Sequence, residues 1–468
     1  MPSAQLLFVK MKKTVVLLWL LIAATTTFSQ NEYKADWTSL DSRPIPSWYE
    51  DAKFGIFVHW GIYSVPAWAP NSGEVYTRYA EWYWNRIMEG THEGVDFVRF
   101  HKAMYGENAR YQDFAPHFKA ELFAPGQWAE LFQQSGARYV VLTSKHHEGF
   151  ALWPSAQSVN WNSVDVGPHR DLCGELSAAV KKTGLHMGFY YSLYEWYNPL
   201  YKSNVAQYVD QHMLPQLRDL ILRYQPDVLW TDGEWEHPSK VWRAEEFLQW
   251  LYTESPVADR VVVNDRWGKE TRGVHGGFYT TEYDLVHDAD SRNHVFTHPW
   301  EECRGIAGSF GYNRGERIED YSTAEQLIHL LIEKVSRGGN LLLNVGPTAD
   351  GRIPVIMQER LQQIGEWLKV CGEAIYGTRQ WYDMPATNRT DGVFFTRKEK
   401  NVYVLLTDRR SRWLKIGGLS RVVSMELLGS TQKLNWKRNA SGVAVEVPAL
   451  TIDASPCPYA WVMKITTK

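Results

Sequence analysis

Short apolar runs alternate with longer amphipathic stretches along most of this chain. The apolar runs are typical of strands buried on both faces, and they occupy residues 54–61, 139–147, 186–196, 228–232, 261–266 and 340–346. Apolar residues at helical spacing predict helices over residues 123–136, 171–184, 205–224, 245–254 and 322–338, with a further helix starting at Pro354. Strands that alternate with helices in this way imply βαβ units and a parallel sheet.

The fold class that follows is α/β, with a distorted (β/α)8-like TIM barrel as its main part. The distortion is expected between residues 265 and 322, where no clean helical stretch occurs, and Ser322 and Glu325 then form a capping box. Beyond about residue 376, short strands separated by Gly, Asp and Asn turns predict an all-β sandwich. We therefore assign residues 30–378 to the barrel and residues 379–468 to a C-terminal β-sandwich domain.

The N-terminus has the pattern of a secretory signal peptide over residues 1–29. Lys10, Lys12 and Lys13 precede an apolar run at residues 15–22, and small or polar residues lead to a cleavage site after Ser29. The apolar run is too short for a membrane span. We expect an exported protein, periplasmic or secreted, without a membrane span.

Composition narrows the range of ligands. The formal net charge of -3 provides no basic field, which argues against nucleic acid as a partner. The 4 cysteines include no closely spaced pair, so a zinc site is not indicated, and free buried thiols are expected. The 22 tryptophans suit sugar binding, because indole faces stack on sugar rings, although core packing also uses many of them.

Carboxylates gather at the end of one predicted strand. Asp232, Glu234 and Glu236 follow the apolar run at residues 228–230, and Trp230 and Trp235 flank the first two of them. The C-terminal ends of barrel strands open onto the active site. Tryptophans beside a carboxylate are unfavourable on a plain surface, so we interpret this stretch as part of a binding site.

Other polar residues end the remaining strands, and barrel geometry brings all these ends to one face. The residues concerned are His59, His146, His147, Tyr191, Asp232 and Arg266. Metal binding is a competing use of the histidines. However, adjacent histidines in a strand point in opposite directions, which makes joint ligation of one ion awkward. We therefore predict no metal site.

Carboxylate chemistry beside aromatic surfaces indicates glycoside hydrolysis. The chain has no glycine-rich phosphate loop and no nucleophile elbow at a strand–helix junction. Arg266 is expected to help keep Asp232 ionised, since a nearby cation lowers the pKa of a carboxyl group. Candidates for a second, proton-carrying carboxyl group are Glu282 and the pair Glu301 and Glu302, and the pattern alone does not choose between them.

Six motifs between about residue 40 and residue 380 are long enough to be specific. They are FVHWG at 57–61, AEWY at 80–83, TSKHHEGF at 143–150, YYS at 190–192, WTDGEW at 230–235 and NLLLNVGP at 340–347. In this order they resemble the α-L-fucosidases of glycoside hydrolase family 29. The resemblance implies a distorted barrel with a C-terminal β-sandwich. It also implies a retaining exo-α-L-fucosidase that acts on fucosylated oligosaccharides or glycoconjugates and needs no cofactor.

The resemblance also implies roles for single residues. Asp232 matches the nucleophile, Glu282 matches the acid/base of several members, and Glu301 is the second choice for that role. The positions that match fucose-binding residues are His59, Glu81, Trp82, His146, His147, Tyr191 and Arg266. Two alternatives stay open: a retaining glycosidase for a related sugar such as galactose, and a fucose-binding protein without turnover.

Overall fold

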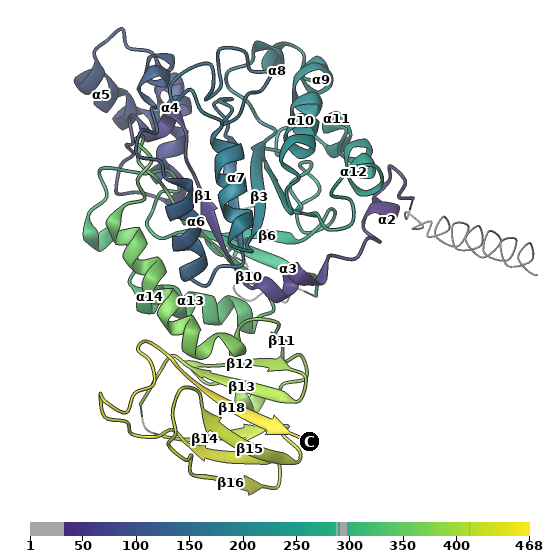
Figure 1. The fold of residues 1–468 in the computed structure, drawn as a ribbon, viewed down its shortest axis with the longest axis vertical. Helices are drawn as coiled ribbons and strands as arrows, with labels where there is room; N and C mark the ends of the chain where they lie inside the picture. Colours follow the sequence, from purple (N-terminus) through teal and green to yellow (C-terminus); the bar gives the residue numbers. More distant parts are fainter. Residues whose placement is uncertain (1–31, 287–288, 291–296, 411) are drawn as a thin grey trace, which may run out of the picture.

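The computed structural model describes residues 32–286, 289–290, 297–410 and 412–468. The chain folds into a β/α barrel followed by two antiparallel sheets (Figure 1). The signal peptide expected over residues 1–29 lies outside the described residues. None of the helices in the described ranges combines the length and apolar character that a membrane crossing requires.

Within the described residues, eight parallel strands form the barrel, in the spatial order β5-β4-β3-β2-β1-β10-β9-β6. Their bounds are β1 Phe54–Val58, β2 Tyr139–Lys145, β3 His186–Ser192, β4 Val228–Asp232, β5 Val262–Val263, β6 Tyr279–Glu282, β9 Trp300–Gly305 and β10 Asn340–Val345. The end strands β5 and β6 meet at a parallel bridge between Asn264 and Phe278. The predicted barrel is thereby confirmed, with the junction of β5 and β6 as its weakest seam.

Helices surround the barrel, and several of them lie alongside its strands (Figure 1). They are α2 Trp37–Leu40, α3 Ser47–Ala52, α4 Tyr83–Glu89, α5 Gly94–Tyr105, α6 Pro125–Gln134, α7 Leu172–Lys182, α8 Pro199–Ser203, α9 Val205–Tyr208, α10 Leu214–Tyr224, α11 Ser239–Trp242, α12 Ala244–Thr253, α13 Ala324–Ser336 and α14 Val355–Cys371. The helix predicted over residues 205–224 contains a π-helical turn, Val209–Met213, between α9 and α10. Pro215 explains the turn, because proline has no N–H to continue the α-helical pattern.

The expected irregularity lies between α12 and α13. The described residues there form β5, β6, β9, a short hairpin of β7 (Leu285–Val286) and β8 (Ala289–Asp290), and a 3-10 turn at Ile318–Asp320. One detail differs from the prediction, since Thr323 and Gln326, rather than Ser322 and Glu325, form the capping box of α13. The Ser322 amide instead donates to the carbonyl of Ile306, 2.8 Å away, which keeps this residue in the preceding loop.

The C-terminal part consists of a sheet in the order β11-β12-β13-β18-β15 and a smaller sheet in the order β14-β17-β16. The strands are β11 Arg379–Gln380, β12 Val393–Lys398, β13 Asn401–Leu406, β14 Trp413–Gly417, β15 Val422–Leu427, β16 Trp436–Asn439, β17 Gly442–Glu446 and β18 Trp461–Thr467. The larger sheet packs against α13 and α14 (Figure 1). The predicted all-β module is confirmed.

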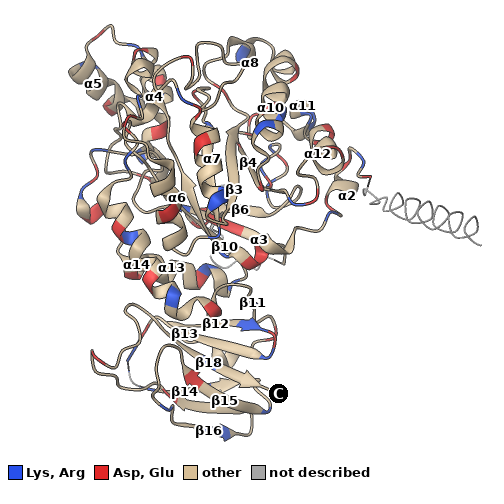
Figure 2. Ribbon diagram, in the orientation of Figure 1, with Lys and Arg blue, Asp and Glu red and all other residues tan. Residues whose placement is uncertain are grey.

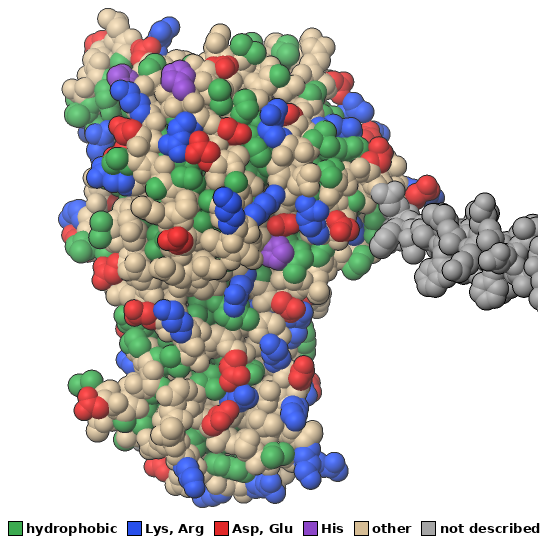
Figure 3. All heavy atoms as spheres, viewed as in Figure 1, with side chains coloured by type: hydrophobic (Ala, Val, Ile, Leu, Met, Phe, Trp, Pro, Cys, Tyr) green, Lys and Arg blue, Asp and Glu red, His purple; other side chains and the backbone are tan. Residues whose placement is uncertain are grey.

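Charged residues of both signs are spread over the helices and the C-terminal sheets (Figure 2). On the face shown in Figure 3, Lys and Arg side chains alternate with Asp and Glu side chains. This face therefore lacks the concentrated basic patch by which proteins bind nucleic acid.

Candidate active site

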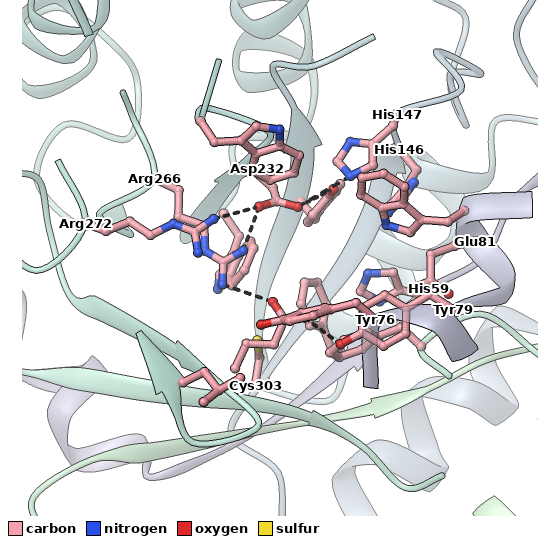
Figure 4. A pocket seen from close by; sticks show the side chains of 18 of the residues that line it. His59, Tyr76, Tyr79, Glu81, His146, His147, Asp232, Arg266, Arg272 and Cys303 are labelled. Atoms are coloured by element: carbon pink, nitrogen blue, oxygen red, sulfur yellow. Dashed lines mark hydrogen bonds and ion pairs between the residues drawn. The ribbon is translucent and has the colours of Figure 1, made fainter. Parts of the chain in front are cut away.

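A cavity of about 330 Å³ opens at the C-terminal ends of the barrel strands (Figure 4). Barrel enzymes bind their substrates at this end. The residues predicted for the site that line the cavity are His59, Glu81, Trp82, His146, His147, Asp232, Arg266 and Glu282. The volume is near the lower end of the range for small-molecule sites, which suits one small polar ligand.

Asp232 is the last residue of β4, and both oxygens of its carboxylate accept hydrogen bonds. Its Oδ1 accepts a hydrogen bond from Arg266 Nη1 at 2.6 Å, and its Oδ2 accepts one from the Tyr190 hydroxyl at 2.9 Å. Arg272 Nη2 lies 3.7 Å from Oδ1. Burial alone would raise the pKa of Asp232, but the Arg266 cation and its neighbours lower it to about 2. Asp232 is therefore an ionised carboxylate at any ordinary pH.

Glu282 ends β6 and faces Asp232 across the same guanidinium. Arg266 Nη2 donates to Glu282 Oε2 at 3.3 Å, and the Tyr79 hydroxyl donates to Oε1 at 2.8 Å. Thr280 accepts from Arg266 Nε at 3.0 Å, and the guanidinium lies over the Trp230 ring, 4.4 Å from its centroid. Arg266 thus holds the two carboxyl groups on one side of the cavity.

A strained turn follows Glu282 directly. Tyr283 and Asp284 both have left-handed backbone conformations, with φ of 50° and 64°, which non-glycine residues rarely adopt. Asp284 is held there by ion pairs with Lys334 and with Arg304 Nη2, the latter at 2.7 Å. Such strain persists only where surrounding contacts hold it, so these pairs help to position Glu282.

His59 and His147 present hydrogen-bond acceptors to the cavity. The Asn344 amide nitrogen donates to the Phe310 carbonyl at 2.7 Å, so its Oδ1 accepts from His59 Nδ1, also at 2.7 Å. The Ser192 hydroxyl donates to the Tyr194 carbonyl at 2.5 Å, so its oxygen accepts from His147 Nδ1 at 2.6 Å.

Burial sets the protonation state of the His59 and His147 rings, and these hydrogen bonds set their tautomer. Burial lowers the pKa of His59 to about 3 and that of His147 to about 4. Both rings are neutral, and with the proton on Nδ1 each keeps an unprotonated Nε2.

Glu81 and Trp82 reach the cavity from a 3-10 turn, Ala80–Trp82, in the long aromatic loop after β1. Glu81 Oε2 accepts from the Gly311 amide at 2.8 Å, and burial raises the pKa of this glutamate to about 7. Trp82 packs edge-on against His147 and, nearly parallel, beside Trp235. The loop thus provides one polar group and part of an aromatic wall.

Tyr191 does not lie where the sequence motif suggested. Its hydroxyl donates to Gln216 Oε1 in α10 at 2.8 Å, so the side chain points outward, between the sheet and the helices. The neighbouring Tyr190 points inward, lines the cavity and donates to Asp232. Side chains alternate between the two faces of a strand, and the register of β3 places Tyr190, not Tyr191, on the inner face.

Glu301, the second choice for the acid/base, lies outside the cavity. In the pairing of β6 with β9, Glu301 is opposite Thr280, whereas Glu282 is opposite Cys303. Two residues of strand separate these levels by roughly 6–7 Å. The Glu301 carboxylate is fully buried and accepts hydrogen bonds from Trp230 Nε1 and from the hydroxyls of Tyr49 and Tyr139. It holds the lower barrel core together and does not reach the cavity.

Three further side chains belong to the site, although the sequence did not single them out as site residues. Tyr79 bonds Glu282, Tyr190 bonds Asp232, and Arg272 lies beside Asp232 while Arg272 Nε donates to Glu234 at 2.5 Å. The alternation of β3 would have pointed to Tyr190 once its register was known. Arg272 lies in the loop between β5 and β6, which carries no periodic signal.

This arrangement is typical of enzymes that cleave glycosidic bonds with a pair of carboxyl groups, so fold and site define the class as glycoside hydrolase. A family model described as α-L-fucosidase matches residues 20–373, and one described as α-L-fucosidase C-terminal domain matches residues 386–466. The chain therefore belongs to the α-L-fucosidases, glycoside hydrolase family 29, and the activity expected from its sequence motifs is confirmed.

Relatives and solved structures agree with this assignment. The chain is 43% identical over 467 residues to the tissue α-L-fucosidase of Rattus norvegicus, with 96% of each chain covered. It is 44% identical over 464 residues to an α-L-fucosidase of Branchiostoma floridae, covering 96% of this chain and 99% of the other. The Thermotoga maritima α-fucosidase, solved with a mechanism-based inhibitor, superimposes with a TM-score of 0.79 at 38% identity, covering 93% of this chain and 100% of that one.

Proposed function

We propose that Asp232 is the nucleophile and Glu282 the general acid/base of a two-step, retaining hydrolysis of terminal α-L-fucosides. The observation that carries the proposal is the sharing of Arg266, whose terminal nitrogens lie 2.6 Å from Asp232 and 3.3 Å from Glu282. Retaining glycosidases need two carboxyl groups about 5–5.5 Å apart. Two carboxyl groups on one guanidinium meet this need for closeness.

In the first step, Asp232 attacks the anomeric carbon and the bond to the leaving glycan oxygen breaks, while Glu282 gives that oxygen its proton. In the second step, Glu282 takes a proton from water. The water oxygen bonds to the anomeric carbon, fucose leaves with its configuration retained, and Asp232 is free again. The low pKa of Asp232 supports its role, because an attacking carboxylate must be ionised.

The substrate proposed is a fucosylated oligosaccharide or glycoconjugate, with the fucosyl group alone inside the cavity. His59, His147 and Glu81 would bind ring hydroxyls, and aromatic rings would pack the 6-methyl group. A methyl group in an apolar pocket is worth about 1–3 kcal/mol. Slow turnover of galactose-configured substrates is therefore expected in a panel of aryl glycosides.

The proposal includes export, which the charged and apolar N-terminal pattern supports. N-terminal sequencing of the protein recovered outside the cytoplasm should begin at Gln30. An intact N-terminus on such a protein would contradict it.

Azide rescue tests both catalytic roles, because the two variants should give opposite anomers of fucosyl azide. Asp232→Gly should lower kcat by at least about 10³-fold. Azide would then attack from the side of the missing carboxylate and give the β-anomer. Glu282→Ala should still form the fucosyl-enzyme from an aryl fucoside with a good leaving group, and azide would release the α-anomer.

Glu301→Ala is the matched control for Glu282→Ala. It removes the acceptor of three buried hydrogen bonds, which should lower the free energy of unfolding by about 2–5 kcal/mol. No fucosyl azide is expected from it. Rescue of Glu301→Ala as the α-anomer, with none for Glu282→Ala, would reverse the assignment.

A further inference from the structure

Two buried polar atoms face each other directly behind the cavity without a hydrogen bond. Nδ1 of His146 and Oε2 of Glu148 are 3.6 Å apart, and neither has a hydrogen-bond partner among the described residues. The side chains are 3% and 1% exposed. Buried polar atoms are normally paired, so two unpaired atoms at this distance call for a functional explanation.

His146 differs in this respect from the other two histidines of the site. Asn344 fixes the tautomer of His59, and Ser192 fixes that of His147, so that both offer an acceptor nitrogen to the cavity. Among the described residues, no such partner fixes His146. Sugar hydroxyls both donate and accept hydrogen bonds, and a site with acceptors from two histidines gains from a donor on the third.

The nearby Lys145 cation does not keep Glu148 ionised. Lys145 Nζ lies 2.6 Å from Glu195 Oε2, so this cation is already paired. Burial raises the pKa of Glu148 to about 8. The negative charges of Glu195 and Glu81 also raise this pKa, and with burial they outweigh the lowering by the Lys145 cation. Glu148 therefore carries its proton at neutral pH.

The remaining groups that face Glu148 are neutral. Burial, and next the charge of Glu148, raise the pKa of the Tyr63 and Tyr111 hydroxyls well above their ordinary value. Burial, and then His147 and His59, lower the pKa of His146 well below its ordinary value. The pair is thus a carboxylic acid that can donate and a neutral imidazole that can accept.

We propose that Glu148 is a positioning residue whose carboxylic acid donates to His146 Nδ1 when the cavity is filled. This bond fixes the proton of His146 on Nε2 and turns the ring into a hydrogen-bond donor toward a fucose hydroxyl. Closing the gap from 3.6 Å to an ordinary hydrogen-bond distance needs a movement of roughly 0.6–0.9 Å, and hydrogen bonds of active sites often tighten only when the substrate binds. The inference rests on the cavity being the fucose site, and not on which carboxylate attacks.

The consequence is a loss of fucose affinity at alkaline pH. When Glu148 loses its proton, its carboxylate accepts from Nδ1–H instead, and Nε2 becomes an acceptor like the other two. The Ki of L-fucose should then rise about tenfold per pH unit above pH about 8, as expected for the loss of one proton. Burial raises the pKa of Glu81 to about 7, so its ionisation changes Ki about one pH unit below the rise assigned to Glu148.

The test is the Ki of L-fucose against an aryl α-L-fucoside, measured across pH 6 to roughly 10. Glu148→Gln keeps a donor of the same shape but cannot ionise, so the rise above pH 8 should disappear. The control is Glu316→Gln, which alters a glutamate outside the cavity whose pKa burial also raises, to about 7. It should keep the wild-type profile.

Two outcomes would overturn the inference: a wild-type Ki that does not rise, or a rise that persists in Glu148→Gln. If Glu148→Gln fails to fold, His146→Gln takes its place, because removing the imidazole must also remove the rise. A rise that persists in His146→Gln overturns the inference equally. Binding of L-fucose requires no attack by Asp232, so failure here is distinct from failure of the catalytic assignment.

Discussion

Arg266 is the side chain on which the chemistry of the site depends most. Both of its terminal nitrogens are used for carboxyl groups, and Nε donates to Thr280 Oγ1, which in turn donates to Asp265 Oδ1 at 2.7 Å. The guanidinium is almost fully buried. A planar fork of donors that is always charged suits this double contact, and lysine could not reproduce it.

Replacing Arg266 should make Asp232 sensitive to acid. Arg266→Gln removes the main cation that lowers the pKa of Asp232, so this pKa should rise by about 1–3 units. Because a raised carboxyl pKa means protonation at higher pH, the acidic limb of kcat/KM should move to higher pH. At neutral pH, kcat/KM should fall by about 10²–10³-fold.

Arg272→Gln is the comparison for this prediction. Arg272 lies 3.7 Å from Asp232 and is bonded to Glu234, so the shift of the acidic limb should be smaller. A pH profile of Arg266→Gln with an unchanged acidic limb would contradict the electrostatic account.

The residue types of the site were predictable from sequence, but not which side chains face inward. The strand of Tyr190 and Tyr191 is apolar throughout, since both faces of a barrel strand are covered. Without alternation, only the pairing with β4 decides that Tyr190 points to Asp232. The choice between Glu282 and Glu301 likewise depends on the register of β6 and β9, which the sequence does not encode locally.

Among strands and helices, the seam between β5 and β6 is the most sensitive junction of the barrel. The two strands meet at one bridge, and no helix lies between them in the described residues. The amides of Gly277 and Phe278 donate to the carbonyls of Asn264 and Val263 at 3.1 and 3.0 Å. Arg266 and Glu282 lie on opposite sides of this seam, so its closure sets their separation.

Gly277→Ala should open this seam. A Cβ at this position would lie 1.8 Å from the Val263 carbonyl oxygen, so the strands must move apart. We expect a loss of roughly 1–3 kcal/mol in the free energy of unfolding, together with a lower kcat, measured by chemical denaturation and aryl fucoside hydrolysis.

Gly126→Ala is the control for this substitution, because nothing lies within 4 Å of its added Cβ and the residue is helical. It should be neutral or stabilise by about 0.4–1 kcal/mol. Equal stability of Gly277→Ala and the wild-type enzyme would show that the seam tolerates movement.

The order of strands and helices was predictable because short apolar runs alternate with stretches of apolar residues at helical spacing over most of the barrel. The pattern failed where structure depends on distant contacts. The segment after Asp265 forms strands without helices between them, and the ion pairs of Asp284 with Lys334 and Arg304 stabilise its turn. These partners come from other elements, so local sequence carries no signal for them.

At the scale of the whole molecule, one apolar core extends through the barrel and the C-terminal sheets. Trp367 of α14 and Met463 of β18 belong to the same buried cluster. Trp367 Nε1 donates to the Ala460 carbonyl at 2.9 Å, and His329 Nε2 lies 3.1 Å from the Tyr459 carbonyl oxygen. A continuous core implies that both parts stabilise each other.

We therefore expect one cooperative unfolding transition in calorimetry. Trp367→Phe removes a buried hydrogen bond and should lower the free energy of unfolding by about 1–2 kcal/mol while keeping a single transition. Trp413→Phe, which alters an indole that is 47% exposed on β14, should change it by less than about 0.5 kcal/mol. Two separate transitions in the wild-type protein would show that the parts unfold independently.

The most direct test of the account is to trap the covalent intermediate. Incubation with a 2-deoxy-2-fluoro-fucosyl fluoride, followed by digestion and mass spectrometry, should label one peptide and place the sugar on Asp232. The label should be absent from Asp232→Gly. A label on any other residue, or an active enzyme that never forms the adduct, would contradict the assignment of Asp232 as the nucleophile.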